Sequence, residues 1–261
     1  LEADGIGIIP AESGQLASGL EGTGRMAEPE TILKAIEDYF EAKKDPKIKG
    51  KKVLITAGPT YENIDPVRFI GNHSSGKMGF AIAEKFLADG AEVVLVAGPT
   101  KLTLEHPSLK LVKIRTALEM LDAVQKEWDS CDFGVFSAAV ADYRPADVAE
   151  QKIKKSEDEI TIRLVKNPDI LKWAGENKTN QILIGFALET NDLELNAQKK
   201  LEKKNLNFIV MNTLMDPGAG FGHDTNKISI LDDHNNFKSF ELKSKKDVAK
   251  DIVNYLKNYS S

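Results

Sequence analysis

A polar loop with serines and glycines follows the first long apolar run of the sequence. The run VLITAG (53–58) precedes RFIGNHSSGKMG (68–79), in which residues 74–76 lead into a helical pattern. The free N–H groups and the dipole at a helix N-terminus favour an anion, and glycines at 76 and 79 permit close approach of the backbone. The spacing matches neither the P-loop nor the Rossmann glycine motif. The loop predicts a phosphate site, with a glycine turn that only packs helix on strand as the alternative.

Two further apolar runs end in residues that suit a nucleotide. Ala138 and Ala139, in SAAVADYRP (137–145), are small enough for a ligand to lie against the backbone. Asp142 can accept hydrogen bonds from ribose hydroxyls or help to hold a metal, although a loop aspartate is more commonly a turn or cap residue. Phe186, in ILIGFAL (182–188), can stack on a base, although core packing is the default for such a side chain.

Lysines supply the predicted positive charge. Lys200 and Lys204 are four residues apart on one face of a predicted helix, where like charges oppose each other unless a polyphosphate lies between them. The alternative is a solvated helix face. Lys152 opens the segment KIKK, where a surface charge or an edge-strand lysine is the plainer interpretation.

His73 is expected to order its loop, and the other histidines show no metal-ligand spacing, so no metal ligands are assigned.

Apolar strands alternate with helical patterns from Val53 onwards, which predicts an α/β, Rossmann-like fold. We expect a mainly parallel sheet with helices on both faces, and ligands at the carboxyl ends of its strands. The first helix is predicted over 74–90, with a serine N-cap. Residues 152–166 are predicted to form two short strands, a β-hairpin or flap, and residues 227–244 a terminal antiparallel hairpin.

Composition excludes several classes of function. The net charge of -5 gives no basic face for nucleic acid, and no apolar stretch is as long as a membrane span. Cys131 is the only cysteine, which rules out an intrachain disulfide and a multi-cysteine zinc site. A cytoplasmic protein is expected, because no signal peptide is visible. The first residue is not Met, which predicts a fragment of a longer chain or a processed product.

Four segments together resemble phosphopantothenate–cysteine ligase, which in bacteria is usually the C-terminal half of a bifunctional coenzyme A biosynthesis protein. The resemblance runs from about Lys52 to the C-terminus. Its motifs are ITAGPTYENIDPVRFIGNHSSGKMGFAIA, SAAVADYRPADVAEQKIKK, LVKNPDIL and GFALET. The predicted organisation is therefore an arm (1–30), a helix and linker (31–51) and the ligase domain (52–261).

Residues 1–30 resemble the end of the other half of that protein, the flavin-dependent decarboxylase. Ser18 stands where many decarboxylases have a proton-donating cysteine. The part that binds FMN is missing from this chain, so decarboxylation by the chain is not expected.

The resemblance implies a reaction in two steps. The phosphopantothenate carboxylate attacks the α-phosphate of CTP in the presence of Mg²⁺ and releases pyrophosphate, which leaves an acyl-cytidylate. The amine of L-cysteine then attacks this mixed anhydride and releases CMP. The preference for CTP over ATP is implied by the resemblance to the bacterial bifunctional protein, in which the decarboxylase and the ligase are fused. It does not follow from the chemistry of the residues.

The resemblance also implies residue roles. Asn72 matches the residue that holds the activated acyl group for amide formation, and Lys152 matches a position at the triphosphate end. Arg68 matches a residue that reaches the site from the partner subunit, which implies a homodimer with shared active sites. The phosphopantothenate site would be lined by Arg68, Asn72, Ala138, Ala139 and Asp142. Expected nucleotide contacts are Gly58, Ser74, Ser75, Gly76, Asp142, Lys152, Pro168, Asp169, Ile170, Leu171, Phe186, Lys200 and Lys204.

Two other functions stay open at this point. A Rossmann oxidoreductase that uses NAD(P) is disfavoured, because the glycine motif is absent after the first strand and no acidic residue ends VVLVAG (93–98). A nucleotide-binding assembly module, with no catalysis of its own, is the second alternative.

Overall fold

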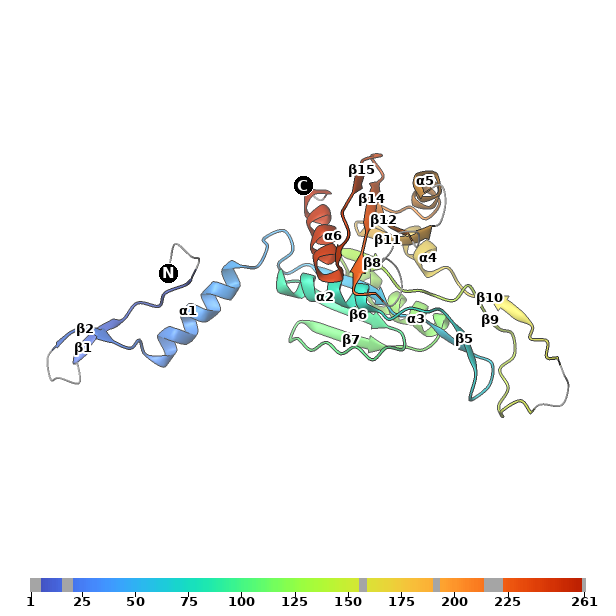
Figure 1. Ribbon diagram of the computed structural model, residues 1–261, viewed down its shortest axis with the longest axis horizontal. Coiled ribbons are helices and arrows are strands. Elements are labelled where there is room, and N and C mark those ends of the chain that lie inside the picture. Colours follow the sequence, from blue (N-terminus) through green and yellow to red (C-terminus); the bar gives the residue numbers. More distant parts are fainter. Residues whose placement is uncertain (1–5, 16–20, 155–158, 190–192, 214–222, 260–261) are drawn as a thin grey trace. The chain divides into compact units, whose positions relative to one another are not determined.

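The computed structural model describes the chain apart from residues 1–5, 16–20, 155–158, 190–192, 214–222 and 260–261 (Figure 1). The chain divides into two compact units, Leu1–Pro46 and Lys47–Ser261. The first unit contains an antiparallel hairpin of β1 (Glu12–Gln15) and β2 (Glu21–Arg25), followed by α1 (Pro29–Ala42). The glycine-rich composition of this segment did not predict the hairpin. Ser18 lies outside the described residues.

An eight-stranded sheet forms the centre of the second unit (Figure 1). Its order is β15-β14-β12-β11-β8-β3-β6-β7. The six strands from β12 to β7 are parallel, and β14 and β15 extend the sheet as an antiparallel hairpin. The predicted parallel sheet and terminal hairpin are confirmed. The bounds are β3 (Lys52–Ala57), β6 (Glu92–Ala97), β7 (Leu109–Lys113), β8 (Phe133–Phe136), β11 (Ile182–Glu189), β12 (Phe208–Thr213), β14 (Ile228–Asp232) and β15 (Phe237–Ser239).

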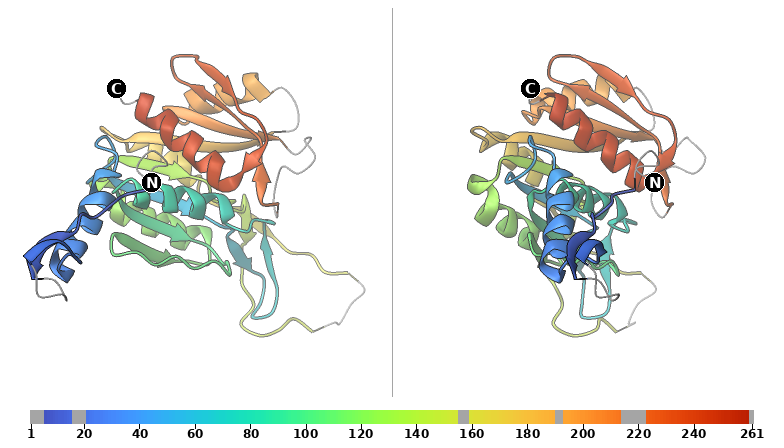
Figure 2. Two further views of the ribbon diagram at one scale, coloured as in Figure 1. Left: turned by 60° about the vertical axis from the view of Figure 1, so that its left-hand side comes forward. Right: turned by 90° about the vertical axis from the view of Figure 1, so that its left-hand side faces the viewer.

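Helices cover both faces of this sheet, as predicted. The helices α2 (Lys77–Ala88) and α6 (Lys245–Tyr259) lie side by side on one face (Figure 2). The other face carries α3 (Ala117–Glu127), α4 (Ile170–Glu176) and α5 (Leu193–Lys203). Because successive strand residues point to opposite faces, Val53 and Ile55 join the first core and Leu54 joins the second. Among the described residues, no helix has the length and apolar character needed to cross a bilayer.

The predicted serine cap of α2 is wrong. The helix begins at Lys77, and its N-cap is Gly76 in a left-handed conformation with φ 78°. A side chain there would be strained, and its Cβ would lie 3.4 Å from the Gly58 backbone. The two serines form the loop before the turn, and the Ser75 carbonyl accepts a hydrogen bond from Thr100.

The flap is a hairpin with a different first strand from the one predicted. Its strands are β9 (Tyr143–Pro145) and β10 (Leu164–Lys166). Residues 152–154 form no strand, so the predicted first strand of 152–166 is wrong, and of the predicted second strand only residues 164–166 are in a strand. A second hairpin pairs β4 (Tyr61–Asn63) with β5 (Phe69–Gly71), and β13 (Thr225–Asn226) pairs with β16 (Lys243–Ser244).

Candidate functional site

Two cavities adjoin at the carboxyl ends of the central strands. The first, here the α4 cavity, has a volume of about 520 Å³, and the second, the α2 cavity, has about 450 Å³. They share the residues Ala138, Val140, Asp142 and Phe186. The ends of β8 and β11 therefore form a wall with a cavity on each side.

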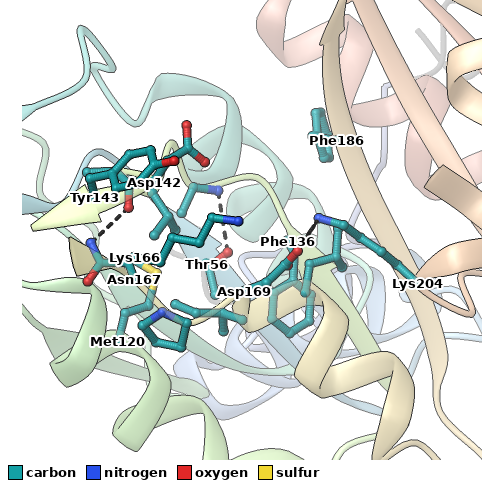
Figure 3. A pocket seen from close by; sticks show the side chains of 16 residues that line it. Thr56, Met120, Phe136, Asp142, Tyr143, Lys166, Asn167, Asp169, Phe186 and Lys204 are labelled. Carbon is teal, nitrogen blue, oxygen red and sulfur yellow. Dashed lines mark hydrogen bonds and ion pairs between the residues drawn. The ribbon is translucent and has the colours of Figure 1, made fainter. Parts of the chain in front are cut away.

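The α4 cavity contains an ion pair next to a helix N-terminus (Figure 3). Asp169 caps α4 by accepting from the Lys172 backbone N–H at 3.0 Å. The same carboxylate accepts from Lys204 Nζ at 3.0 Å. Lys204 follows α5 and is only partly exposed. Its ammonium group is thus held at the cavity. An anionic ligand bound there can replace Asp169 as the partner of this ammonium group.

The opposite wall of the α4 cavity is held by hydrogen bonds to the chain before Asp142. Thr60 Oγ1 accepts from the Ala141 N–H at 3.0 Å, and Asn167 Nδ2 donates to the Ala141 carbonyl at 2.8 Å. Arg144 in turn donates to Asn167 Oδ1 at 3.2 Å. The Asp142 side chain is exposed and lines both cavities. The sequence reasoning missed Asn167, although a polar residue directly before PDIL was a usable signal.

The α2 cavity is formed by the serine–glycine loop and the SAAVAD segment. Asn72 Nδ2 donates at 3.1 Å to the carbonyl oxygens of both Ala139 and Val140, which ties the loop to the end of β8. Gly79 faces Ala57, and an added Cβ would lie 2.5 Å from the Ala57 Cβ. The glycine at 79 thus packs helix on strand. The predicted residues that line this cavity are Asn72, Ser74, Ser75, Gly76, Ala138, Ala139, Asp142 and Phe186.

Predicted nucleotide residues cluster in the α4 cavity. Its lining includes Asp142, Pro168, Asp169, Ile170, Leu171, Phe186 and Lys204, whereas Ser74, Ser75 and Gly76 line the α2 cavity. Lys200 lies on α5 and is in neither lining, so its expected contact with a triphosphate together with Lys204 stays a prediction. Gly58 lies behind the loop with φ 76°, packed against the backbone of Gly98.

Arg68 and Lys152 lie at a different place, where the flap meets the β4–β5 hairpin. Arg68 donates to Asp65 Oδ2 at 2.5 Å and to the Ile153 carbonyl at 3.1 Å. The hydrogen bond from Arg68 holds the pKa of the buried Asp65 carboxyl well below its usual range. Lys152 precedes Ile153 and is exposed. Neither Arg68 nor Lys152 is among the described residues that line the α4 or the α2 cavity.

The carboxylates at the cavities fit a hard cation shared with phosphate. Among the described residues, Asp142 and Asp169 are the carboxylates in the two linings. Mg²⁺ is usually held by one or two carboxylates together with water and substrate phosphates. A separate acidic cluster includes Asp232, but its carboxylate accepts from Asn236 and Tyr255 and serves the β14–β15 turn.

Comparison with known proteins places the chain in a family. Residues 48–259 match the family model "DNA/pantothenate metabolism flavoprotein C-terminal domain". A crystal structure of the C-terminal domain of the coenzyme A biosynthesis bifunctional protein CoaBC is 41% identical, with a TM-score of 0.70. The match covers 82% of this chain and 97% of that one.

Two relatives cover nearly the whole chain. The bifunctional protein CoaBC of Haemophilus influenzae is 47% identical over 97% of this chain, which spans 62% of that protein. A protein named cysteine/cysteine sulfinic acid decarboxylase, from an unknown prokaryotic organism, is 48% identical over 97% of this chain and 71% of its own length. With its matching sheet and its cavities at the strand ends, the chain belongs to the family of the DNA/pantothenate metabolism flavoprotein C-terminal domain.

Proposed function

We propose that this chain is a ligase that joins phosphopantothenate to L-cysteine with CTP as the energy source, in coenzyme A biosynthesis. Family membership and the similarity to CoaBC proteins support this role. The observation that carries the proposal is the pair of cavities that meet at Asp142 and Phe186. One cavity suits a nucleotide, and the other suits the acid that reacts with its α-phosphate.

In the first step, a carboxylate oxygen of phosphopantothenate attacks the α-phosphorus of CTP. The bond from this phosphorus to the bridging oxygen breaks, and pyrophosphate leaves with the electron pair. Negative charge builds up on the phosphates, and a cation held in advance stabilises it without reorganisation. Lys204 supplies such a charge. When bound, Mg²⁺ would add Lewis-acid stabilisation, with Asp142 and Asp169 as its protein ligands.

In the second step, the amine nitrogen of cysteine attacks the acyl carbon. A C–N bond forms, the C–O bond to the nucleotide breaks, and CMP leaves with the electron pair while the amine releases a proton to solvent. Asn72 holds the acyl group beside the Ala139 and Val140 carbonyls. A neutral amide suits this task, because a carboxylate there would repel an acyl phosphate.

The remaining roles complete the proposal. Arg68 reaches the phosphopantothenate site of a partner subunit in a homodimer, which agrees with its position outside the described linings of the α4 and α2 cavities. Lys152 and Lys200 approach the triphosphate once it is bound.

A nucleotide panel tests the proposal. Pyrophosphate is measured with phosphopantothenate and each of CTP, ATP, GTP and UTP, and cysteine is then added. We expect release with CTP, followed by formation of the amide and CMP. Binding of CTP without turnover would favour an assembly module, and binding of NAD(P) would favour an oxidoreductase. Carbon dioxide release from cysteine alone would favour the activity in the name of the second relative.

A further inference from the structure

One part of the α2 cavity, here its polar end, is lined by polar residues that the α4 cavity does not share. Asn212, near the end of β12, lines it together with Asn226 of β13 and Lys245, the first residue of α6. Asn212 lies on the same face of β12 as Phe208 and Val210, because residues two apart in a strand point to the same side. Phe208 and Val210 pack in the core under α2 and α6. Three separate elements thus bring polar side chains to this end of the cavity.

Two buried oxygen atoms at this end lack hydrogen-bond donors. Asn212 Oδ1 and Asn226 Oδ1 are buried without a partner among the described residues. Among all described residues, one other buried side-chain oxygen, Asp89 Oδ2, is without a hydrogen-bond partner by the same criterion. It lies 2.6 Å from the Lys257 ammonium, so an ion pair compensates it. Asn226 is only 3% exposed. Leaving a buried acceptor unpaired costs about 1–3 kcal/mol, so a ligand that donates here would recover that energy.

Two lysines line the same cavity as these oxygens. Lys245 is 9% exposed, and its ammonium donates to the His223 carbonyl at 2.6 Å. Lys77 also lines the cavity and is paired with Asp224 at 2.5 Å. Burial, and then the nearby Lys77 charge, lower the pKa of Lys245. A carboxylate ligand would offset the free-energy cost of burying the Lys245 charge and the repulsion between Lys245 and Lys77.

We propose that this end of the α2 cavity binds the acceptor amino acid, with its amine donating to the amide oxygens of Asn212 and Asn226 and its carboxylate facing Lys245. The inference rests on the proposed function and names the subsite of the second substrate. The donor pattern is selective, because a phosphate or carboxylate carries no hydrogen for an amide oxygen.

The arrangement would also orient the nucleophile. A neutral amine has two N–H bonds and one lone pair. If both N–H groups donate to the asparagine oxygens, the lone pair points away from these oxygens and is available for attack. Asn72 lines the same cavity and is proposed to hold the acyl group. Attack on the acyl carbon then needs no movement of the amino acid between cavities.

The test separates the two half-reactions in the full chain. Pyrophosphate release is measured with CTP and phosphopantothenate alone, and apparent KM values are then measured for L-cysteine and for cysteamine, which lacks the carboxylate. We expect Asn226→Leu to raise the KM for both acceptors at least about tenfold, in line with the loss of a hydrogen bond. Pyrophosphate release should stay within about twofold, because the proposal assigns this end to the acceptor of the second step alone.

Lys245 is tested through the carboxylate. We expect Lys245→Met to raise the KM for cysteine to that for cysteamine and to leave the cysteamine value unchanged. Lys245→Arg should keep most of the preference for cysteine. Lys250→Met is the matched control, because Lys250 lies on the same helix and pairs with Asp247 on the surface.

Two results would overturn the inference. One is an unchanged KM for cysteine in Asn226→Leu and Lys245→Met. The other is a raised KM for phosphopantothenate or CTP, which would assign this end to the first step. Circular dichroism and Tm show whether each variant is folded, and Asn226→Ala replaces the leucine variant if that one is not. Absence of pyrophosphate release by the wild-type protein would instead contradict the proposed function itself.

Discussion

The Asn72 side chain connects the serine–glycine loop to the SAAVAD segment, the two stretches of chain that form the α2 cavity. Its Nδ2 group donates to two successive carbonyl oxygens at the end of β8, so the amide plane is fixed against the SAAVAD segment. Its oxygen takes no part in these two bonds. A neutral side chain at this point fixes the two carbonyl groups that border the cavity and does not repel an acyl phosphate beside them, which agrees with asparagine at the position.

Replacement of Asn72 by Asp should separate the two steps of the reaction. We expect Asn72→Asp to release pyrophosphate but to accumulate acyl-cytidylate, because a carboxylate repels both the backbone carbonyls and the acyl phosphate. Chromatography of quenched reactions would detect the intermediate. Asn177→Asp, at the C-cap of α4 and outside both cavities, is the control. Normal amide formation by Asn72→Asp would remove the role assigned to it.

Lys152 poses a different question, because it is exposed and lines neither cavity. If it approaches the bound triphosphate, Lys152→Gln should slow pyrophosphate release by about 100-fold, the loss typical of removing a preorganised charge or donor. The control is Lys172→Gln, which removes a surface lysine paired with Glu176. A normal rate for Lys152→Gln would show that the triphosphate lies elsewhere.

Cys131 should be inert in the folded protein. It is buried, and burial raises the pKa of its thiol to about 11. The reactive thiolate is therefore scarce at pH 8. We expect almost no reaction with a thiol reagent at that pH under native conditions and one thiol per chain in denaturant. Rapid native labelling at pH 8 would mean that the segment around residue 131 opens readily.

At the scale of elements, α4 and the end of α5 meet at a glycine. A Cβ at Gly175 would lie 1.9 Å from the Lys204 carbonyl oxygen, and Asn205 donates to the Gly175 carbonyl at 2.9 Å. This contact sets the position of Lys204 at the α4 cavity. The two helices can approach so closely only because one of them has no side chain at the contact.

Gly175→Ala should therefore affect both stability and the site. The gain in helix propensity is at most about 1 kcal/mol, whereas overpacking against a backbone atom costs about 1–3 kcal/mol. We expect a lower free energy of unfolding in urea and a higher KM for CTP. Gly7→Ala is the control, since nothing lies within 4 Å of its added Cβ. An unchanged stability would mean that the two helices separate without cost.

At the scale of the whole molecule, the second unit contains both hydrophobic cores and both cavities. In the first unit, α1 has no buried residue. A chain starting at Lys47 should therefore keep its Tm and its rate of pyrophosphate release. Calorimetry and the pyrophosphate assay measure both quantities. Aggregation or loss of turnover in the shortened chain would show that residues 1–46 are needed.

The amino-acid sequence by itself determined the strand and helix pattern and the ends of the strands. Runs such as VLITA and EVVLVA are apolar on both faces, which is typical of parallel strands between helical layers. The position of Asp142 after one such run, and of Phe186 late in another, predicted a site at the carboxyl edge. Local patterns carry this information because burial acts on each strand separately.

Only the tertiary structure decided which of these residues meet. The parallel registers of β8 with β11 and of β11 with β12 bring the two cavities together. They also place Asn212 at the polar end of one cavity. The left-handed Gly76 replaced the predicted serine cap. Lys152 lies between β9 and β10 in the chain and is in neither described lining. Backbone dihedrals, strand registers and unpaired buried atoms depend on residues far apart in the sequence, so no local pattern encodes them.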